Sequence, residues 1–447
     1  MIMATENKYL HFVNFSRFLR WDVKAYSFLQ KEFDNAVLLQ DILTPYDVPL
    51  PKDEMIDKGW SIISKINFAG KLFLRKPEET KTFKGSLHKV DGDTLIYSKI
   101  NVRHGCVYYH PNGATPFGVS SEYPAYKIDK RRVNGEFLVL LLQSQYFKDA
   151  LSARTSGISK ARVKPSVFLT VQIPLPSLKT QNKIVGAYNE ALANANQCTQ
   201  KAQEMNEQIE AYLQEVLGLT QANTSIRQNA VGIFMRLVHL KNITRWDVYN
   251  SKSSIYDGIY ENVLLREILV SHPKYGAGYK AEKTQRDVRY IRITDINEDG
   301  SLNEDYASVA KYDKQYLLKQ NDFLIARTGN TVGKTFLYDE SMGKAIYAGY
   351  LIKFELDTDK VNPHYLLAYT KSSVYKTWIK NNMRVSAQPN INSRQYEESP
   401  IILPPLDIQN DIVTHIAALR TKQKNLQQQA FELRQQAQQQ FEQTLFN

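Results

Sequence analysis

Two long segments of the chain carry apolar residues at alternating spacings of three and four, over 185–216 and 412–445. This spacing is typical of the a and d positions of a coiled coil, and no proline interrupts either segment. Several seam positions hold small or polar residues: Ala195, Ala202, Asn206, Gln423 and Ala430. Such residues favour a closely packed pair, so the pattern predicts two long antiparallel helices.

A stretch of short β-rich runs precedes each helix. Runs such as LIYSKI at 95–100 and FLIART at 323–328 alternate with Gly, Asn and Pro turns and with a few helical segments. This mixture is typical of an α+β domain, and prolines mark its exit into the helix. We therefore predict two α+β domains joined by two long helices. The predicted boundaries are 1–178 for the first domain, 179–219 for its helix, 220–234 for a linker, 235–406 for the second domain and 407–447 for its helix.

The two halves of the chain repeat each other. The tetrapeptide RWDV stands at 20–23 and again at 245–248. Further matches keep their order: LLQDIL at 38–43 with LLREIL at 264–269, SKINFAGKL at 64–72 with TDINEDGSL at 294–302, GDTLIYSK at 92–99 with NDFLIART at 321–328, VNGEF at 133–137 with VNPHY at 361–365, and LPSLKTQNKIV at 175–185 with LPPLDIQNDIV at 403–413. Chance does not preserve this order, which indicates a tandem duplication with a unit of about 225 residues.

Charge and cysteine content narrow the class of protein. The chain has 57 Lys and Arg against 46 Asp and Glu, a net charge of +11 that is compatible with a polyanionic partner. The longest strictly apolar run, 137–142, is too short to cross a bilayer, and the N-terminal residues lack the apolar core of a signal peptide. Cys106 and Cys198 form no CxxC pair, so we expect a cytoplasmic protein without structural disulfides.

The order of these motifs resembles the specificity (S) subunits of Type I restriction-modification systems. The resemblance covers essentially the whole chain. It is carried by the two RWDV copies, YIRITDINEDGSL at 290–302, FLIARTGNTVGKTFLY at 323–338 and RVSAQPNINSRQYEESPIILPPLDIQNDIV at 384–413, with looser counterparts at 95–109 and 157–185. The family implies two target-recognition domains, each of which reads one half of a bipartite site in double-stranded DNA. It also implies paired helices that set the spacer between the half-sites.

The same resemblance implies partners and cofactors. The helices would dock two modification (methyltransferase) subunits, and restriction (motor-nuclease) subunits would complete the complex. S-adenosylmethionine and ATP would be bound by those partner subunits, so we expect no cofactor and no metal on this chain.

Base readout requires bidentate side chains, Arg for guanine and Asn or Gln for adenine, with Lys and Arg on phosphates. Candidates in the second unit are Lys280, Lys283, Arg286, Arg327, Asn330, Lys334, Gln388, Asn390, Asn392 and Arg394. Candidates in the first unit are Lys99, Asn101, Arg103, Lys160, Arg162 and Lys164. An ordinary hairpin at 329–334 and a polar loop at 386–395 are the alternative interpretations. Because 156–165 is basic whereas 386–395 is rich in amides, we expect the two domains to read different sequences.

Three segments suggest chemistry of other kinds. VNPHY at 361–365 resembles the Asn-Pro-Pro-Tyr/Phe motif of amino-methyltransferases, but Asn362 followed by Pro363 is also an ordinary helix start. RHGCVYYH at 103–110 places two His and one Cys on one face of an expected strand, without a fourth zinc ligand. GNTVGK at 329–334 lacks the spacing of a P-loop.

The sequence thus predicts a non-catalytic DNA-recognition subunit. Two alternatives stay open. A fused DNA methyltransferase would bind a cofactor by itself, and a protein-only coiled-coil adaptor would lack salt-dependent DNA binding.

Overall fold

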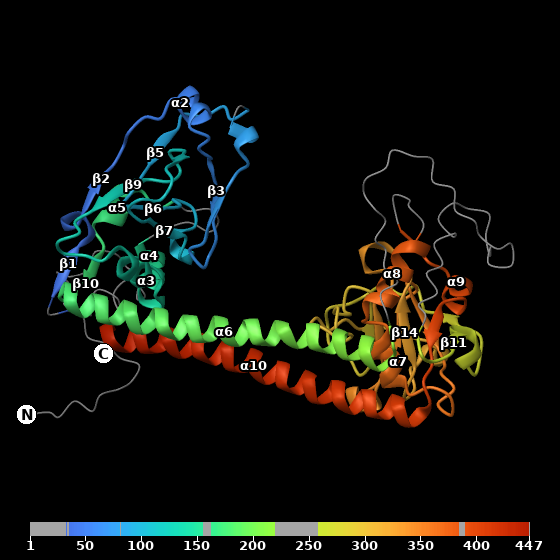
Figure 1. Cartoon of the computed structure of the whole chain (residues 1–447). Helices are drawn as coiled ribbons and strands as arrows, with labels where there is room; N and C mark the ends of the chain where they lie inside the picture. The colour runs from blue at the N-terminus through green and yellow to red at the C-terminus, as the bar shows by residue number, and fades with distance from the viewer. Residues whose placement is uncertain are drawn as a thin grey trace, which may run out of the picture. The chain divides into compact units, whose positions relative to one another are not determined.

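The computed structural model describes residues 33, 35–80, 82–154, 162–219, 258–383 and 389–446 (Figure 1). The chain divides into two compact units, Met1–Gln197 with Gln429–Asn447 and Cys198–Gln428, so each long helix contributes to both. Both units combine helices with small sheets, which confirms the α+β class. The two RWDV copies lie outside the described residues.

The first unit is built around a four-stranded antiparallel sheet of order β2-β9-β6-β7. Its strands are β1 (Ala36–Leu38), β2 (Leu43–Pro45), β3 (Ile63–Ile66), β4 (Leu72–Leu74), β5 (His88–Val90), β6 (Thr94–Tyr97), β7 (Val107–His110), β8 (Phe117–Val119), β9 (Ala125–Ile128) and β10 (Gln172–Pro174). Its helices are α2 (Lys52–Asp57), α3 (Gly135–Gln143), α4 (Gln145–Arg154) and α5 (Pro165–Leu169), with 3-10 turns η2 (Leu39–Asp41), η3 (Pro77–Thr80) and η4 (Val102–His104).

The second unit repeats this plan with a four-stranded sheet of order β12-β17-β14-β15. Its strands are β11 (Asn262–Leu264), β12 (Lys274–Tyr275), β13 (Arg289–Ile291), β14 (Phe323–Ala326), β15 (Thr335–Leu337), β16 (Ala345–Tyr347), β17 (Leu351–Phe354) and β18 (Pro400–Ile402). Its short helices are α7 (Pro363–Tyr369), α8 (Ser373–Asn382) and α9 (Ser393–Glu397), with 3-10 turns η7 (Leu265–Ile268), η8 (Lys314–Tyr316), η9 (Gly329–Thr331) and η10 (Glu340–Met342).

Equivalent features of the two units confirm the duplication. In the first unit β1 pairs with β10, and in the second β11 pairs with β18, both antiparallel. The tight turn before the central strand has a left-handed residue in each unit, Asp93 with φ of 61° and Asn321 with φ of 67°. Asn and Asp tolerate this conformation better than most residues. The sequence repeat is therefore a repeat of backbone geometry.

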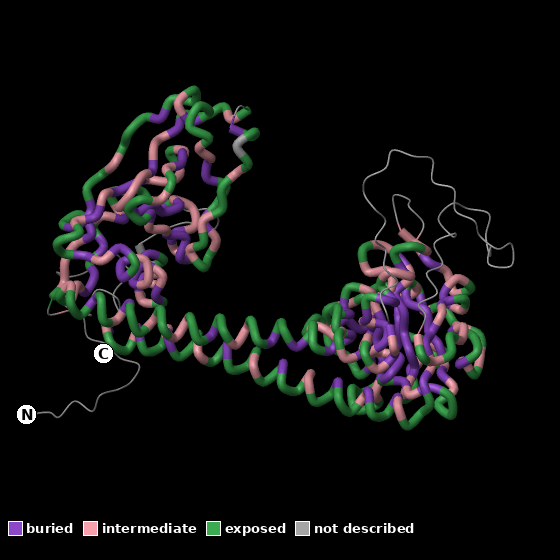
Figure 2. The backbone as a smooth tube through the Cα atoms, in the orientation of Figure 1, coloured by how far each residue is buried: buried purple, intermediate pink, exposed green. Residues whose placement is uncertain are grey.

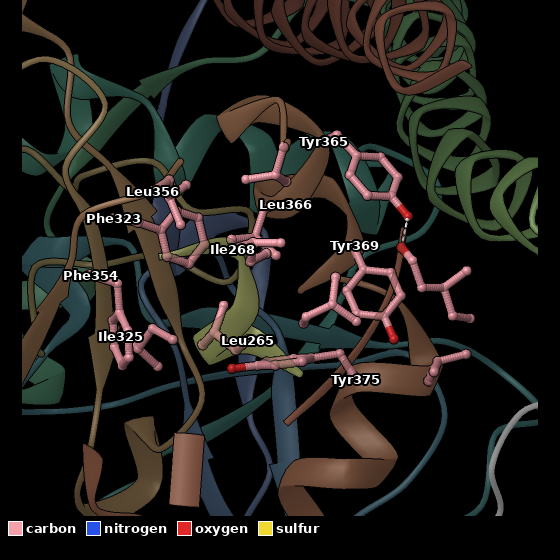
Figure 3. Packing of buried hydrophobic residues seen from close by; sticks show 14 of the residues in the cluster. Leu265, Ile268, Phe323, Ile325, Phe354, Leu356, Tyr365, Leu366, Tyr369 and Tyr375 are labelled. Carbon is pink, nitrogen blue, oxygen red and sulfur yellow. Dashed lines mark hydrogen bonds between the residues drawn. The ribbon is translucent and has the colours of Figure 1, made fainter. Parts of the chain in front are cut away.

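The core of the second unit lies between the sheet and its helices (Figure 3). Phe323 and Phe354 come from the neighbouring strands β14 and β17, and they pack in one buried cluster with Leu265 of η7 and Tyr365 of α7. The hydroxyl of Tyr365 donates a 2.5 Å hydrogen bond to the carbonyl oxygen of Ile402, which satisfies the polar end of a fully buried ring. The cluster thus fixes α7 against β18.

The two predicted coiled-coil helices are α6 (Leu178–Val216) and α10 (Leu406–Phe446). In the second unit, Gln423 donates to the carbonyl oxygen of Ala202 and Tyr212 stacks on His415 at 4.0 Å. Residue numbers therefore rise along one helix as they fall along the other, which confirms antiparallel pairing. In the first unit, Arg434 donates to Asn196 and Tyr188 packs on Phe441 in the same sense.

The burial of the helices follows the predicted seam with one correction. Buried residues recur along both helices (Figure 2), among them Ala195, Ala202 and Ala430. Asn206, which was predicted on the seam, is exposed, while Met205 is 4% exposed. The side chain of Asn206 instead accepts a hydrogen bond from Arg420, so the polar residue lies at the edge of the seam.

A buried glutamine near the start of each long helix fastens that helix to the domain before it. Gln409 donates to the carbonyl oxygens of Pro404 and Lys360 and accepts from the backbone N–H of Asn362. Gln181 makes the corresponding bonds to Pro176, Arg132 and Asn134 in the first unit. The glutamine of the QN dipeptide that both halves share therefore links each domain to its long helix. None of the described helices is both long and apolar enough to span a membrane.

Candidate nucleic-acid interface

Two candidate segments of the second unit, 327–334 and 389–395, are joined through their backbones. Thr328 and Asn390 form an antiparallel bridge. The N–H of Gly329 donates to the carbonyl oxygen of Pro389 at 2.9 Å, and the N–H of Ile391 donates to that of Arg327 at 3.0 Å. The structure therefore brings together two candidate segments that lie about sixty residues apart in the sequence.

The buried side chain of Tyr396 forms hydrogen bonds to the backbone at both ends of the turn at 326–333. Its hydroxyl donates to the carbonyl oxygen of Ala326 at 2.8 Å and accepts from the N–H of Gly333 at 3.1 Å. Burial raises the pKa of Tyr396 well above its ordinary value, so the hydroxyl stays protonated and keeps its donor role. Gly329 and Gly333 have positive φ, so these two glycines provide the turn geometry of the segment 329–334.

Arg327 lies on an aromatic ring at the end of β14. Its guanidinium carbon is 4.9 Å from the ring centre of Tyr275. The tyrosine hydroxyl donates to Oγ of Ser393 at 3.0 Å and accepts from the N–H of the same residue at 3.1 Å. A cation over an aromatic ring is attracted to its negative face. The contacts therefore link three separate segments of the unit.

The amide-rich segment contains both engaged and unengaged side chains. Asn392 caps α9, and its side chain accepts from the N–H of Gln395 in a capping box, so its oxygen is already in use. The Oδ1 atom of Asn390 is buried and has no hydrogen-bond partner among the described residues. Arg394 and Asn330 are exposed. Asn390 and Arg394 are thus better placed than Asn392 to receive a ligand, and their contact with DNA stays a prediction.

The remaining candidates of the second unit lie apart from this surface or are engaged elsewhere. Lys334 makes a 2.9 Å ion pair with Glu298 and donates to the carbonyl oxygen of Ile296. Arg286 pairs with Glu282 at 2.9 Å. Lys280 and Lys283 are exposed, and within the described residues no hydrogen bond or ion pair links them to the joined segments. Gln388 lies outside the described residues.

The first unit joins its two candidate segments in the same way. The N–H of Val163 donates to the carbonyl oxygen of Lys99 at 2.8 Å, which matches the bond between Ile391 and Arg327. The hydroxyl of Tyr97 donates to the carbonyl oxygen of Val163 at 3.3 Å. Lys99 and Arg327 therefore occupy equivalent backbone positions in the two units.

The side chains around this backbone hydrogen bond differ from those at the equivalent place in the second unit. Arg162 makes an exposed ion pair with Glu122 at 3.1 Å, and Lys164 is exposed at the start of α5. In the turn η4, Asn101 does not cap with its side chain, and Nε of Arg103 is buried without a partner among the described residues. Lys160 lies outside the described residues.

A pocket of 290 Å³ opens beside Lys99 in the first unit. Its lining is mainly aromatic and apolar: Tyr46, Tyr123, Tyr126, Pro165 and Leu169. Pro165, which lines the pocket, directly follows the basic segment 162–164 in the sequence.

Sequence reasoning missed two aromatic residues of the second unit. Tyr275 begins the segment YGAGYK at 275–280, in which only Lys280 is a predicted DNA contact, and Tyr350 is 56% exposed. The N–H of Arg327 donates to the carbonyl oxygen of Tyr350 at 3.0 Å, which places that residue beside the candidate surface. The only available signal was the presence of aromatic residues next to glycines, which is weak because tyrosine is frequent in this chain.

The structure assigns local roles to the segments that suggested other chemistry. The side chain of Asn362 accepts from the N–H of His364, so Asn362 caps α7 and the capping interpretation is confirmed. His104 is exposed in η4 while Cys106 and His110 are buried, so the three do not share a strand face as expected. Within the described ranges, no group of three His, Cys, Asp or Glu is arranged to hold a metal ion.

Comparison with known proteins shows a similarity to one family over part of the chain. Residues 261–433 match the family described as Type I restriction modification DNA specificity domain. The chain is 19% identical over 294 residues to the Type I restriction enzyme StySPI specificity subunit of Salmonella potsdam, and the match covers 64% of this chain and 58% of that protein. It is 20% identical over 278 residues to the EcoBI specificity subunit of Escherichia coli, covering 61% of this chain and 56% of that protein. The chain thus matches less than two thirds of the length of these relatives.

A solved structure has the same fold. Its description concerns the complex assembly and conformational transition of the type I R-M system. The TM-score is 0.57 at 15% sequence identity, over 91% of this chain and 96% of that chain.

Proposed function

We propose, because residues 261–433 match the Type I restriction modification DNA specificity domain family, that the chain is the DNA-specificity subunit of a Type I restriction-modification complex. Each α+β domain reads one half of a bipartite site in double-stranded DNA. The chain itself carries out no catalysis, and its contribution is to choose the sequence.

One observation supports this proposal most strongly: in each unit the same backbone hydrogen bond links the two candidate segments, but the side chains beside it differ. Lys99 lies at this backbone link in the first unit, and Arg327 and the adjacent Asn390 lie at it in the second. Lys is a point charge, whereas Arg and Asn form planar bidentate contacts with bases. A shared scaffold with divergent polar side chains is what two readers of different sequences require.

The paired helices support a spacing role. In each unit the core includes residues from the beginning of one long helix and from the end of the other: Val185 with Phe441 in the first, Ile412 with Leu213 in the second. Each domain is therefore attached to both helices. We propose that the helices set the spacer length and dock two modification subunits, with restriction subunits completing the complex. S-adenosylmethionine and ATP would then be bound by these partners.

The two alternative functions have less support. The fused-methyltransferase reading depended on Asn362, whose side-chain oxygen is used to cap α7. The hypothesis of a protein-only adaptor gives no role to the unpartnered polar atoms of Arg327 and Asn390, which lie where the two candidate segments meet.

The experiment is selection of duplexes from a randomised library by the purified chain together with its modification subunits, at two salt concentrations. We expect two short specified blocks separated by an unspecified spacer. Binding should weaken as salt rises, with a log–log slope of about −0.9 per neutralised phosphate. Methyl transfer should require the modification subunits. A chain that methylates DNA by itself, or a complex that selects no bipartite sequence, would refute the proposal.

A further inference from the structure

We propose that Arg327 reads a guanine in the half-site of the second unit, and that Tyr275 is the positioning residue that holds its guanidinium ready. This inference rests on the proposed function, because it assumes that the second unit faces DNA. It adds a specific base and a specific pair of side chains to that function.

Both the backbone and the side chain of Arg327 make contacts with other segments of the unit. Its N–H donates to the carbonyl oxygen of Tyr350 at 3.0 Å, and its carbonyl oxygen accepts from the N–H of Ile391 at 3.0 Å. Its guanidinium carbon lies 4.9 Å from the ring centre of Tyr275. The ring is held by the two hydrogen bonds between its hydroxyl and Ser393. These contacts join β12, the end of β14 and the start of α9 around the guanidinium.

One donor of this guanidinium is unsatisfied. Nε of Arg327 is buried, and no residue in the described part of the chain accepts a hydrogen bond from it. A buried donor without an acceptor is unfavourable, so the arrangement favours a ligand that supplies acceptors. The guanidinium presents its donors as a planar fork, which fits a group with two acceptors side by side. In DNA, such groups are the O6/N7 edge of guanine and the oxygens of a phosphate.

Two features favour the guanine edge over the phosphate. First, an aromatic support restricts the direction of the fork, and direction matters for a base edge more than for a phosphate that any nearby cation can neutralise. Second, the adjacent Asn390 carries a buried acceptor without a partner, Oδ1, on the segment bridged to Thr328. A base pair in the major groove offers donors and acceptors together, whereas a phosphate offers acceptors only.

The first unit provides the contrast. Lys99 occupies the position that corresponds to Arg327, and among the described residues it makes no cation–aromatic contact. It lines the 290 Å³ pocket with Tyr46 and Tyr126 instead. The two units therefore use different recognition at the same place, and Lys99 supplies a matched control for the experiment.

The experiment uses the chain with its modification subunits and duplexes that contain the selected bipartite site. Each guanine of the site is replaced in turn by 7-deazaguanine, which lacks the N7 acceptor. We expect one substitution, in the half-site read by the second unit, to weaken binding by roughly tenfold or more, in the range of a good bidentate contact. In the Arg327→Ala complex the same substitution should have no further effect, because the partner of N7 is already absent.

Variants of Tyr275 test the positioning role. Tyr275→Phe keeps the ring but loses the hydroxyl contacts, and Tyr275→Ala removes the stack. Discrimination between guanine and 7-deazaguanine should fall in the order wild type, Phe, Ala, while binding to the other half-site stays unchanged. Arg327→Lys keeps the positive charge but not the planar fork, so it should reduce the discrimination. Lys99→Ala should leave discrimination at this guanine intact.

The outcomes separate this inference from the proposed function. If Arg327→Ala weakens binding to all sequences equally and the 7-deazaguanine effect persists, the side chain contacts phosphate and the inference is wrong. If no guanine in the selected site responds to Arg327, the inference also fails while the bipartite site itself still supports the proposed function. Circular dichroism on each variant checks that the fold is retained.

Discussion

Replacing Gln409 by alanine should loosen the second domain from the helix that follows it. The side chain is 0% exposed and makes three hydrogen bonds: to the carbonyl oxygens of Pro404 at 2.8 Å and Lys360 at 3.0 Å, and from the N–H of Asn362 at 2.7 Å. At about 1 kcal/mol for each net hydrogen bond, the loss is about 3 kcal/mol. Alanine also leaves two carbonyls and one N–H without partners, so this value is a lower bound.

Hydrogen exchange measures this loss locally, which matters because a chain of two units need not unfold in one step. If α7 opens together with this link, a loss of about 3 kcal/mol accelerates exchange of its amides by roughly a hundredfold. The matched variant Gln181→Ala should accelerate exchange in α3 of the first unit by a similar factor and leave α7 unchanged. Less than a threefold change in α7 for Gln409→Ala would refute the assignment of the glutamine as a link between domain and helix.

Three further results are expected. Hydrogen bonds from Lys353 and Ser271 lower the pKa of Glu355 to about 2, so the stability that its charge provides is complete above the ordinary carboxyl pKa and is lost as pH falls from about 5 to 2. In Glu355→Gln the free energy of unfolding should therefore depend less on pH in that window. An unchanged pH dependence would contradict this. Ala202 is 2% exposed and its carbonyl oxygen accepts from Gln423, so Ala202→Leu should overpack the seam and lower the urea midpoint by an amount equivalent to about 1–3 kcal/mol, whereas the exposed Lys201→Leu should not. Seven residues inserted after Ala202 should change the spacer that a library selection tolerates and leave both half-sites the same, provided that circular dichroism shows retained helix; altered half-sites with the old spacer would argue against a spacing role.

The large features of the fold were predictable because their signals extend over many residues. A three-four apolar spacing maintained over thirty residues has few interpretations other than a coiled coil, and α6 and α10 follow it closely. One seam position was misplaced, Asn206 in place of Met205, because a shift of the apolar pattern by one residue is hardly visible in a repeat that extends over many turns. The capping role of Asn362 was equally predictable, since Asn before Pro is a strong local signal.

The arrangement of the candidate site was not predictable, since it depends on contacts across the sequence. The stack of Arg327 on Tyr275 joins residues fifty-two positions apart, and the bridge from Thr328 to Asn390 joins residues sixty-two apart. Composition favoured Asn392 and Asn390 equally, yet the first caps a helix and only the second has an unpartnered oxygen. Residue type alone does not distinguish a side chain that supports the backbone from one that faces a ligand.

The central claim is that the two domains read DNA independently, and binding titration against libraries randomised in one half-site at a time tests it most directly. One variant combines Asn390→Ala with Arg394→Ala in the second unit, and the other combines Lys99→Ala with Lys164→Ala in the first. Each variant is assayed with the modification subunits at two salt concentrations.

We predict that the 390/394 variant relaxes one half-site by roughly tenfold to a hundredfold, at about 1–3 kcal/mol for each bidentate contact, and leaves the other as strict as in the wild type. Any effect of the 99/164 variant on sequence choice should fall on the opposite half-site, and lost phosphate contacts should reduce the salt slope by about one unit each. If the 390/394 variant loosens both half-sites equally, or loosens neither while the protein stays folded, the account of two independent readers is wrong.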